Sequence, residues 1–131
     1  MNKSQISLLL AIKTASVLQK EKIKVSLNKI SIFLLNALYK HGIIQNFIKL
    51  DAGQAAQSPK FLIFLRYFFN KPVVKNLKVF SKPSLKLYLR FADICLIHDK
   101  KHTLFLSTSK GILTNFECKL KKIGGIILFK C

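Results

Sequence analysis

The spacing of hydrophobic and polar residues between Lys29 and Gly42 predicts an amphipathic helix. Apolar side chains recur there at i, i+3, i+4, i+7 and i+8, which is the pattern of a helix with one face on a core. The basic residues Lys40 and His41 in the last turn, followed by Gly42, predict where the helix ends. The expected helix covers Lys29–His41, and its core-facing positions are Ile30, Phe33, Leu34, Ala37 and Leu38.

The same reading places further elements around this helix. Ser4–Leu18 is expected to be a helix with an apolar stripe made by Ile6, Leu9, Leu10 and Val17. Lys22–Val25, Ile43–Leu50 and Phe61–Phe69 have the character of strands, and Asp51–Lys60 that of a loop. Asn70-Lys71-Pro72 interrupts the pattern, so we expect a domain boundary after residue 70. The fold class predicted is therefore α+β, with an N-terminal α-β-α-β-β lobe over residues 1–70.

Residues 71–131 predict a second lobe that is mostly β with short helices. Val73–Val79 is expected to be a strand, Ser81–Ser84 a turn, and Leu85–Arg90 a strand with leucines on one face. Lys86, Tyr88 and Arg90 share its other face. They can bind a nucleic-acid backbone, or they can simply form a solvated outer face. Phe91–His98 is expected to be either a short helix or irregular. Asp99–His102 is expected to be an exposed turn.

Thr103–Thr114 is the stretch with the most suggestive chemistry. The apolar run Leu104–Leu106 predicts a strand, and it is followed by a polar cluster at Ser107–Gly111. A capping box at Thr114 predicts a helix that ends at Gly124-Gly125, before a final strand over Ile126–Phe129. Hydroxyls, a lysine and a turn glycine beside a helix start can bind an anion, although an ordinary polar loop has the same composition.

Charge narrows the possible partners. Among 131 residues, 23 Lys and Arg stand against 5 Asp and Glu, for a net charge of +18 and a pI near 10.2. The basic residues run from Lys3 to Lys130, so they do not form a separate tail. A polyanion is needed to neutralise such a chain, and nucleic acid is the first candidate, with an anionic membrane surface as the alternative. The abundance of Lys, Ile, Phe and Asn also indicates an AT-rich genome, as in organelles.

Other function classes find little support. Cys95, Cys118 and Cys131 lie far apart without a Cys-x-x-Cys motif. His98 and His102 are four residues apart, but the charged residues Asp99–Lys101 between them oppose metal binding. No metal site is therefore expected. Neither paired carboxylates nor a catalytic triad nor a phosphate-loop motif is indicated, which argues against an enzyme. Lys13 interrupts the first apolar run, and no uninterrupted apolar stretch reaches a spanning length. We therefore expect a soluble, unprocessed protein without a cofactor and without membrane insertion.

Two strings resemble a known family. Ser107–Thr114, followed by Gly124-Gly125 and an apolar strand, is similar to the C-terminal signature of the eighth protein of the small ribosomal subunit, in its bacterial form. Ser81–Tyr88 resembles the Ser-Arg-Pro-Gly-Leu-Arg-Ile-Tyr hairpin of the same family. The resemblance extends over essentially the whole chain and is most specific in residues 81–125.

The resemblance implies a structural, non-catalytic protein whose C-terminal lobe binds a helical region in the central domain of small-subunit rRNA. It also implies neighbouring ribosomal proteins as partners, no homo-oligomer, and an organellar member, mitochondrial as the first choice and plastid as the second. Carried over by position, the RNA-binding candidates of the C-terminal lobe are Ser84, Lys86, Tyr88, Ser107, Thr108, Ser109, Lys110, Gly111, Thr114, Gly124 and Gly125. The secondary candidates in the first lobe are Lys13, Thr14, Ser26, Asn28 and Lys29.

The chain departs from the family pattern at three single positions and in one segment. Ile126 stands where the family has a glutamate, Phe116 replaces an arginine in the last helix, and Ser84 replaces a turn glycine. The segment His98–His102 stands where the family has a glycine-bearing segment. These differences leave the expected fold unchanged but loosen the expected RNA contacts, for which lysines elsewhere can compensate electrostatically.

Overall fold

The computed structural model describes residues 2–50, 59–74, 76–98 and 101–131, and it has two compact units. Lys3–Lys75 form the first, here called the N-terminal lobe, and Asn76–Cys131 form the second, the C-terminal lobe. The predicted α+β class with two small lobes is confirmed. The boundary expected after residue 70 falls within a hairpin of the first unit.

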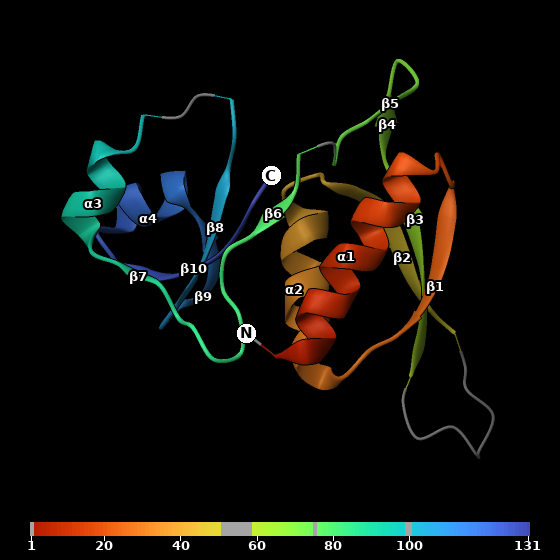
Figure 1. The fold of residues 1–131 in the computed structure, drawn as a ribbon, viewed down its shortest axis with the longest axis horizontal. Helices are drawn as coiled ribbons and strands as arrows, with labels where there is room; N and C mark the ends of the chain where they lie inside the picture. Colours follow the sequence, from red (N-terminus) through yellow and green to blue (C-terminus); the bar gives the residue numbers. More distant parts are fainter. Residues whose placement is uncertain (1, 51–58, 75, 99–100) are drawn as a thin grey trace. The chain divides into compact units, whose positions relative to one another are not determined.

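The N-terminal lobe follows the predicted α-β-α-β-β order. Its elements are α1 (Lys3–Val17), β1 (Lys22–Ser26), α2 (Lys29–Lys40), β2 (Ile44–Leu50) and β3 (Lys60–Leu65). The three strands form an antiparallel sheet in the order β1-β3-β2, and the two helices lie together on one side of it (Figure 1). Each helix must therefore bury one face against the sheet.

The phase predicted for α2 is wrong at two positions. Ile30 is 52% exposed and Phe33 is 70% exposed, whereas Leu34, Leu35 and Leu38 are fully buried. The buried set, which also includes Ser31, repeats the same i, i+3, i+4, i+7 spacing one residue later. Ser31 is tolerated in this face because its hydroxyl donates a hydrogen bond to Ser4 Oγ of α1 at 3.2 Å.

The stripe predicted for α1 is also partly wrong. Leu8, Leu9 and Ile12 are fully buried, but Leu10 is 49% exposed and Val17 is 67% exposed. Apolar residues occur on nearly every side of this helix, so its sequence does not mark one face.

The long strand predicted over Phe61–Phe69 is divided. β3 ends at Leu65, and after Arg66 the short strands β4 (Tyr67–Phe68) and β5 (Lys71–Pro72) pair as a hairpin. Phe69 and Asn70 form its turn with φ of 48° and 58°. Positive φ at both central residues is typical of a turn that follows the twist of paired strands.

The C-terminal lobe contains one five-stranded sheet and two short helices. Its elements are β6 (Lys78–Val79), β7 (Tyr88–Leu89), α3 (Phe91–Leu96), β8 (Leu104–Thr108), β9 (Gly111–Thr114), α4 (Asn115–Lys121) and β10 (Gly125–Lys130). The strand order is β6-β10-β8-β9, with β7 also paired to β10. β10 pairs with β8 along one side and with the two short strands β6 and β7 along the other, and β8 also pairs with β9.

Helices α3 and α4 cover one face of this sheet. Ile94 and Cys118, from the two helices, are fully buried in a cluster completed by the sheet residues Leu104, Leu106, Leu113 and Ile127. Phe105 and Phe129, whose Cα atoms are paired in register between β8 and β10, stack with ring centroids 4.5 Å apart. The helix-covered cluster holds the sheet edge near α4 in place.

The strands predicted over Val73–Val79 and Leu85–Arg90 are much shorter in the structure. Only Lys78–Val79 and Tyr88–Leu89 pair with β10. Between them, Lys82 and Leu85 exchange backbone hydrogen bonds of 3.1 and 3.2 Å around the turn residues Pro83 and Ser84. Leu85 and Leu87 are 52% and 40% exposed, so the predicted apolar face is wrong there. Because of this turn, the segment Lys82–Leu85 does not pair with β10.

The expected loop Asp51–Lys60 and turn Asp99–His102 lie largely outside the described residues. Among the helices that are described, none is long and apolar enough to cross a membrane.

Candidate functional site

The polar cluster at Ser107–Gly111 forms the turn end of a β-hairpin. Ser107 and Thr108 belong to β8, Ser109 and Lys110 make the turn, and Gly111 begins β9. Gly111 has φ +103°, which a glycine adopts without the cost of a side chain. The prediction overlooked β9 because a short strand after a tight turn carries little periodicity.

The Thr108 hydroxyl stabilises this turn. It donates to the Gly111 carbonyl at 2.8 Å and accepts from the Lys110 N–H at 3.2 Å. Its proton is therefore used within the hairpin. Ser109 and Lys110 remain exposed at the tip, and Ser107 is half-buried in β8.

The capping box predicted at Thr114 is confirmed. The Glu117 N–H donates to Thr114 Oγ1 at 3.4 Å, and the Thr114 N–H donates to Glu117 Oε2 at 3.1 Å. Thr114 is only 4% exposed. Its side chain therefore fixes the start of α4 behind the hairpin and does not reach the surface as a contact.

Two glycines let the start of β10 pass between its neighbours. A Cβ at Gly124 would lie 2.6 Å from the Leu89 carbonyl oxygen and 3.0 Å from Tyr88 Oη. A Cβ at Gly125 would lie 2.6 Å from the Ser107 carbonyl oxygen. These distances are too short for any side chain, so the two glycines keep β7 and β8 close to β10.

A surface groove of about 620 Å³ lies at this point of the C-terminal lobe. Six predicted candidates line it, contributed by three separate segments: Tyr88, Ser107, Thr108, Ser109, Gly124 and Gly125. Tyr88 is 64% exposed and supplies an aromatic wall. The structure therefore brings together residues that the sequence places up to 37 positions apart, from Tyr88 to Gly125.

Three further lining residues, Lys122, Ile123 and Ile126, were not among the candidates. Lys122 lies two residues before the glycine pair. Its positive charge is the only feature of the sequence that could have marked it as a candidate. Ile126 gives the groove an apolar edge at the position where the resembling family has a glutamate.

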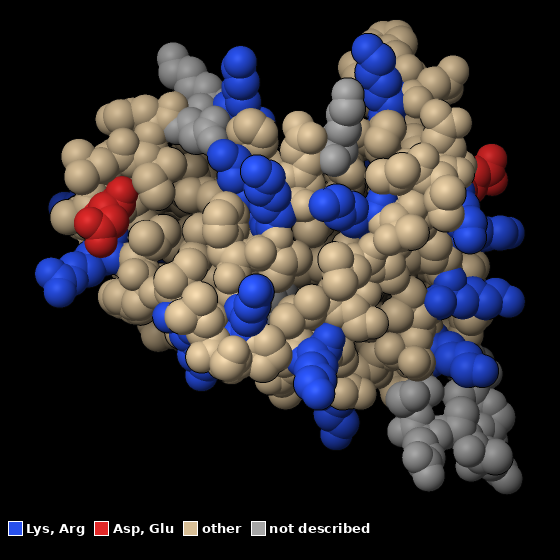
Figure 2. Space-filling model, viewed as in Figure 1, with Lys and Arg blue, Asp and Glu red and all other residues tan. Residues whose placement is uncertain are grey.

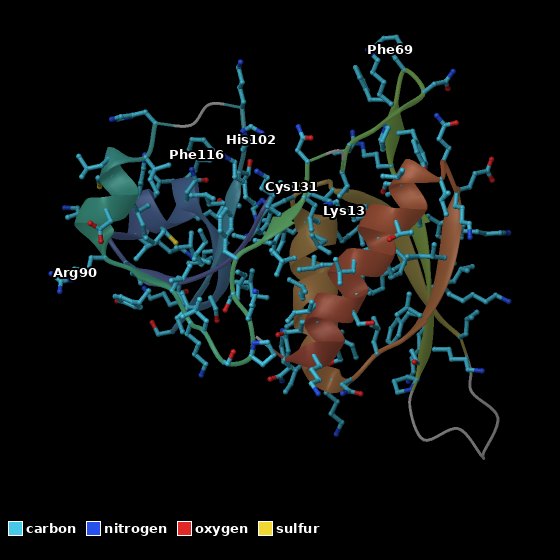
Figure 3. All side chains as sticks on the ribbon, viewed as in Figure 1. Lys13, Phe69, Arg90, His102, Phe116 and Cys131 are labelled. Carbon is cyan, nitrogen blue, oxygen red and sulfur yellow. The ribbon has the colours of Figure 1, made fainter. Side chains whose placement is uncertain are left out.

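The remaining C-terminal candidates lie outside the groove lining. Ser84 and Lys86 are exposed beside the Lys82–Leu85 turn, while Lys110 and Gly111 are exposed at the hairpin tip. Arg90 is also exposed, at the start of α3, where its backbone N–H donates to Asp93 Oδ2 at 3.1 Å (Figure 3). These residues are available at the surface of the same lobe.

The N-terminal candidates form two separate sets. Lys13 and Thr14 lie on α1, where Thr14 Oγ1 donates to the Leu10 carbonyl at 2.9 Å (Figure 3). The other set, Ser26, Asn28 and Lys29, is exposed where β1 leads into α2. The Ser4–Ser31 hydrogen bond places the first turn of α2 beside the first turn of α1, so Lys13 lies about 14 Å farther along that helix.

Positive charge is spread widely over the surface. Lys and Arg side chains are scattered across the face shown in Figure 2, and acidic side chains are sparse on it. No group of three metal-ligating side chains occurs in the part of the chain that the structure describes. A basic surface and a hydroxyl-lined groove with a glycine floor and an aromatic wall have the chemistry to bind a polyanion, on a protein of the α+β class.

Comparison with known proteins identifies the family. The model of the Ribosomal protein S8 family matches residues 6–131, and the chain belongs to this family of structural, non-enzymatic small-subunit ribosomal proteins. It is 41% identical to small ribosomal subunit protein uS8m of Acanthamoeba castellanii over 79% of this chain and 78% of that protein. It is 31% identical to uS8c of Oltmannsiellopsis viridis (92% and 91% covered) and to uS8 of Geobacillus stearothermophilus (92% and 90% covered).

These relatives confirm two predictions. The resemblance to the eighth small-subunit protein holds over nearly the whole chain. The organellar expectation, with mitochondrion before plastid, agrees with the matches to uS8m and uS8c.

Proposed function

We propose that this protein is a structural constituent of the mitochondrial small ribosomal subunit whose C-terminal groove binds a helical region in the central domain of small-subunit rRNA. The observation that supports this most directly is the groove itself, where six of the predicted candidates, from three segments of the chain, meet. In this role the protein supports subunit assembly and translation together with neighbouring ribosomal proteins.

The groove residues divide the binding chemistry among them. The exposed ring of Tyr88 packs against a sugar or base, and the hydroxyls of Ser107 and Ser109 donate to sugar or phosphate oxygens. Gly124 and Gly125 keep β7 and β8 close to β10 and thereby bring Tyr88 and Ser107 to the same groove. Lys86 and Lys110, exposed on the same lobe, add electrostatic contacts with phosphates.

The N-terminal lobe contributes secondary contacts. Its two candidate sets lie apart, so we assign them to different phosphates and not to one pocket. Charge neutralisation by lysines spread in this way raises affinity without reading sequence.

The test combines Ser107→Ala with Ser109→Ala and measures binding to a central-domain fragment of small-subunit rRNA. We expect about a tenfold to hundredfold loss of affinity, since two hydrogen bonds to charged or polar oxygens are removed. Ser7→Ala, an exposed serine on α1, is the matched control and should bind as the parent protein does.

A double variant that binds rRNA as tightly as the parent protein would contradict the groove assignment. Crosslinking in the native extract, followed by sequencing of the attached RNA, addresses the target. Recovery of one segment of small-subunit rRNA at residues 107–111 supports the proposal. Diffuse RNA, or binding to anionic vesicles without a preference for this rRNA, would contradict it.

A further inference from the structure

Lys122 occupies a backbone position that normally belongs to glycine. It ends α4 with φ 54° and ψ 44°, in the left-handed region. The Ile123 N–H donates to the Cys118 carbonyl at 3.1 Å and the Lys122 N–H to the Lys119 carbonyl at 3.4 Å. This pair of bonds is the Schellman motif, whose left-handed residue is usually glycine because a Cβ is strained there.

Lys122 lines the candidate groove together with Tyr88, Ser107 and Ser109. Lys122 is exposed, and it is the only lysine or arginine among the described residues that line the groove. The neighbouring Lys121 lies in the last turn of α4 and is also exposed, but it does not line the groove. A strained backbone at a residue that reaches a binding groove points to a role for its side chain.

We propose that Lys122 is a phosphate-binding residue of the groove, retained in the left-handed conformation because its ammonium neutralises an RNA phosphate bound there. The inference rests on the proposed rRNA binding and adds a contact that neither the motif nor the resemblance indicated. No acidic residue is among the described residues that line the groove, so the Lys122 ammonium has no opposing carboxylate in that lining.

The test is a substitution whose two effects have opposite signs. Lys122→Gly relieves the strain, so the midpoint of thermal unfolding should rise by about 3 °C. The same change removes the cation, so affinity for the central-domain rRNA fragment should fall by about tenfold. The slope of log K against log salt should also become shallower by about 0.9. Lys122→Asn, which tolerates the left-handed region, should lose affinity in the same way, and Lys122→Arg should retain it.

The control is Lys121→Ala, which removes an equal charge outside the groove. It should change affinity by less than about twofold. Equal losses in the Lys121 and Lys122 variants would overturn the inference, because the effect would then be one of general charge. Unchanged affinity and slope in Lys122→Gly would overturn it as well. Failure of the parent protein to bind rRNA would instead contradict the proposed function.

Discussion

At the scale of single residues, Gly124 is the position at which the groove is least tolerant of change. The Leu89 carbonyl, a backbone atom that cannot rotate away, would lie 2.6 Å from an added methyl group. We expect Gly124→Ala to lower the free energy of unfolding by about 1–3 kcal/mol, measured by urea denaturation. Combining it with Tyr88→Phe removes the contact with Tyr88 Oη but leaves the carbonyl. A full rescue of stability by that second change would contradict the backbone explanation.

Cys118 permits a prediction about pH. Burial raises the pKa of its thiol above the ordinary value, the nearby Glu117 raises it further, and Lys121 opposes both. The unfolded chain then loses this proton at lower pH than the folded protein does. The stability that the neutral thiol contributes is therefore complete below the unfolded pKa, about 8.5, and is lost as pH rises through the folded pKa.

The measurement compares the parent protein with Cys118→Ala by urea unfolding between about pH 7.5 and 10. The variant should be less stable at the lower pH because it leaves a small cavity, by about 1 kcal/mol. Its stability should then decline less steeply as pH rises. Cys131, whose pKa burial also raises, is present in both proteins and does not affect the difference. Parallel pH profiles would show that the Cys118 thiol does not titrate differently on folding.

The residue types of the site could be predicted from the sequence, but which of these residues lie close together in the fold could not. Tyr88 and Ser107 were chosen because of local chemistry, and nothing local shows that both lie beside Gly124. Thr108 illustrates the opposite limit. Its hydroxyl was expected to face a ligand, yet it is used in the hairpin turn. Only the backbone geometry distinguishes a donor facing solvent from one satisfied within the fold.

At the scale of elements, α4 depends on its cap. It is a short helix of seven residues, and its first turn is held by the reciprocal Thr114–Glu117 bonds. We expect Thr114→Ala to lower the free energy of unfolding by about 1 kcal/mol, measured by urea denaturation. Thr114→Ser keeps the hydroxyl and should retain most of the stability. A serine variant as unstable as the alanine variant would show that the methyl group, and not the cap, is what matters.

The elements that were predicted well are those whose sequence allows one arrangement. The capping box at Thr114 and the order of the N-terminal lobe belong to this group. The phase of α2 failed because Ile30 and Phe33 fit the helical spacing as well as Ser31 and Leu35 do. A hydrogen bond between Ser31 and Ser4 on another helix contributes to this choice, and such a contact is invisible in a local window. Tertiary packing, and not periodicity, decides which overlapping stripe is buried.

At the scale of the whole molecule, the net charge of +18 opposes folding of the free chain. Like charges spread over a small protein repel each other, and salt screens that repulsion. We therefore expect the midpoint of thermal unfolding of the free protein to rise as KCl increases from about 20 mM to about 300 mM. NaCl should act equally, which separates screening from binding of a particular cation. A midpoint that is constant or falls would mean that the fold does not carry a net repulsive energy.

If the proposed function holds, we expect bound rRNA to reverse this dependence on salt. A ligand that binds only the folded protein stabilises it by RT ln(1 + [L]/Kd), about 2.7 kcal/mol at a hundredfold excess over Kd. Salt weakens binding because it reduces the gain from counterion release. The increase in melting temperature caused by the rRNA fragment should thus be largest at low salt and shrink as salt rises, while the free protein becomes more stable.

Heparin, a polyanion without bases, should reproduce the salt trend, but its stabilising effect should not depend on Tyr88. If Tyr88→Phe and Tyr88→Ala leave the effects of both polyanions unchanged, the aromatic wall of the groove has no part in binding.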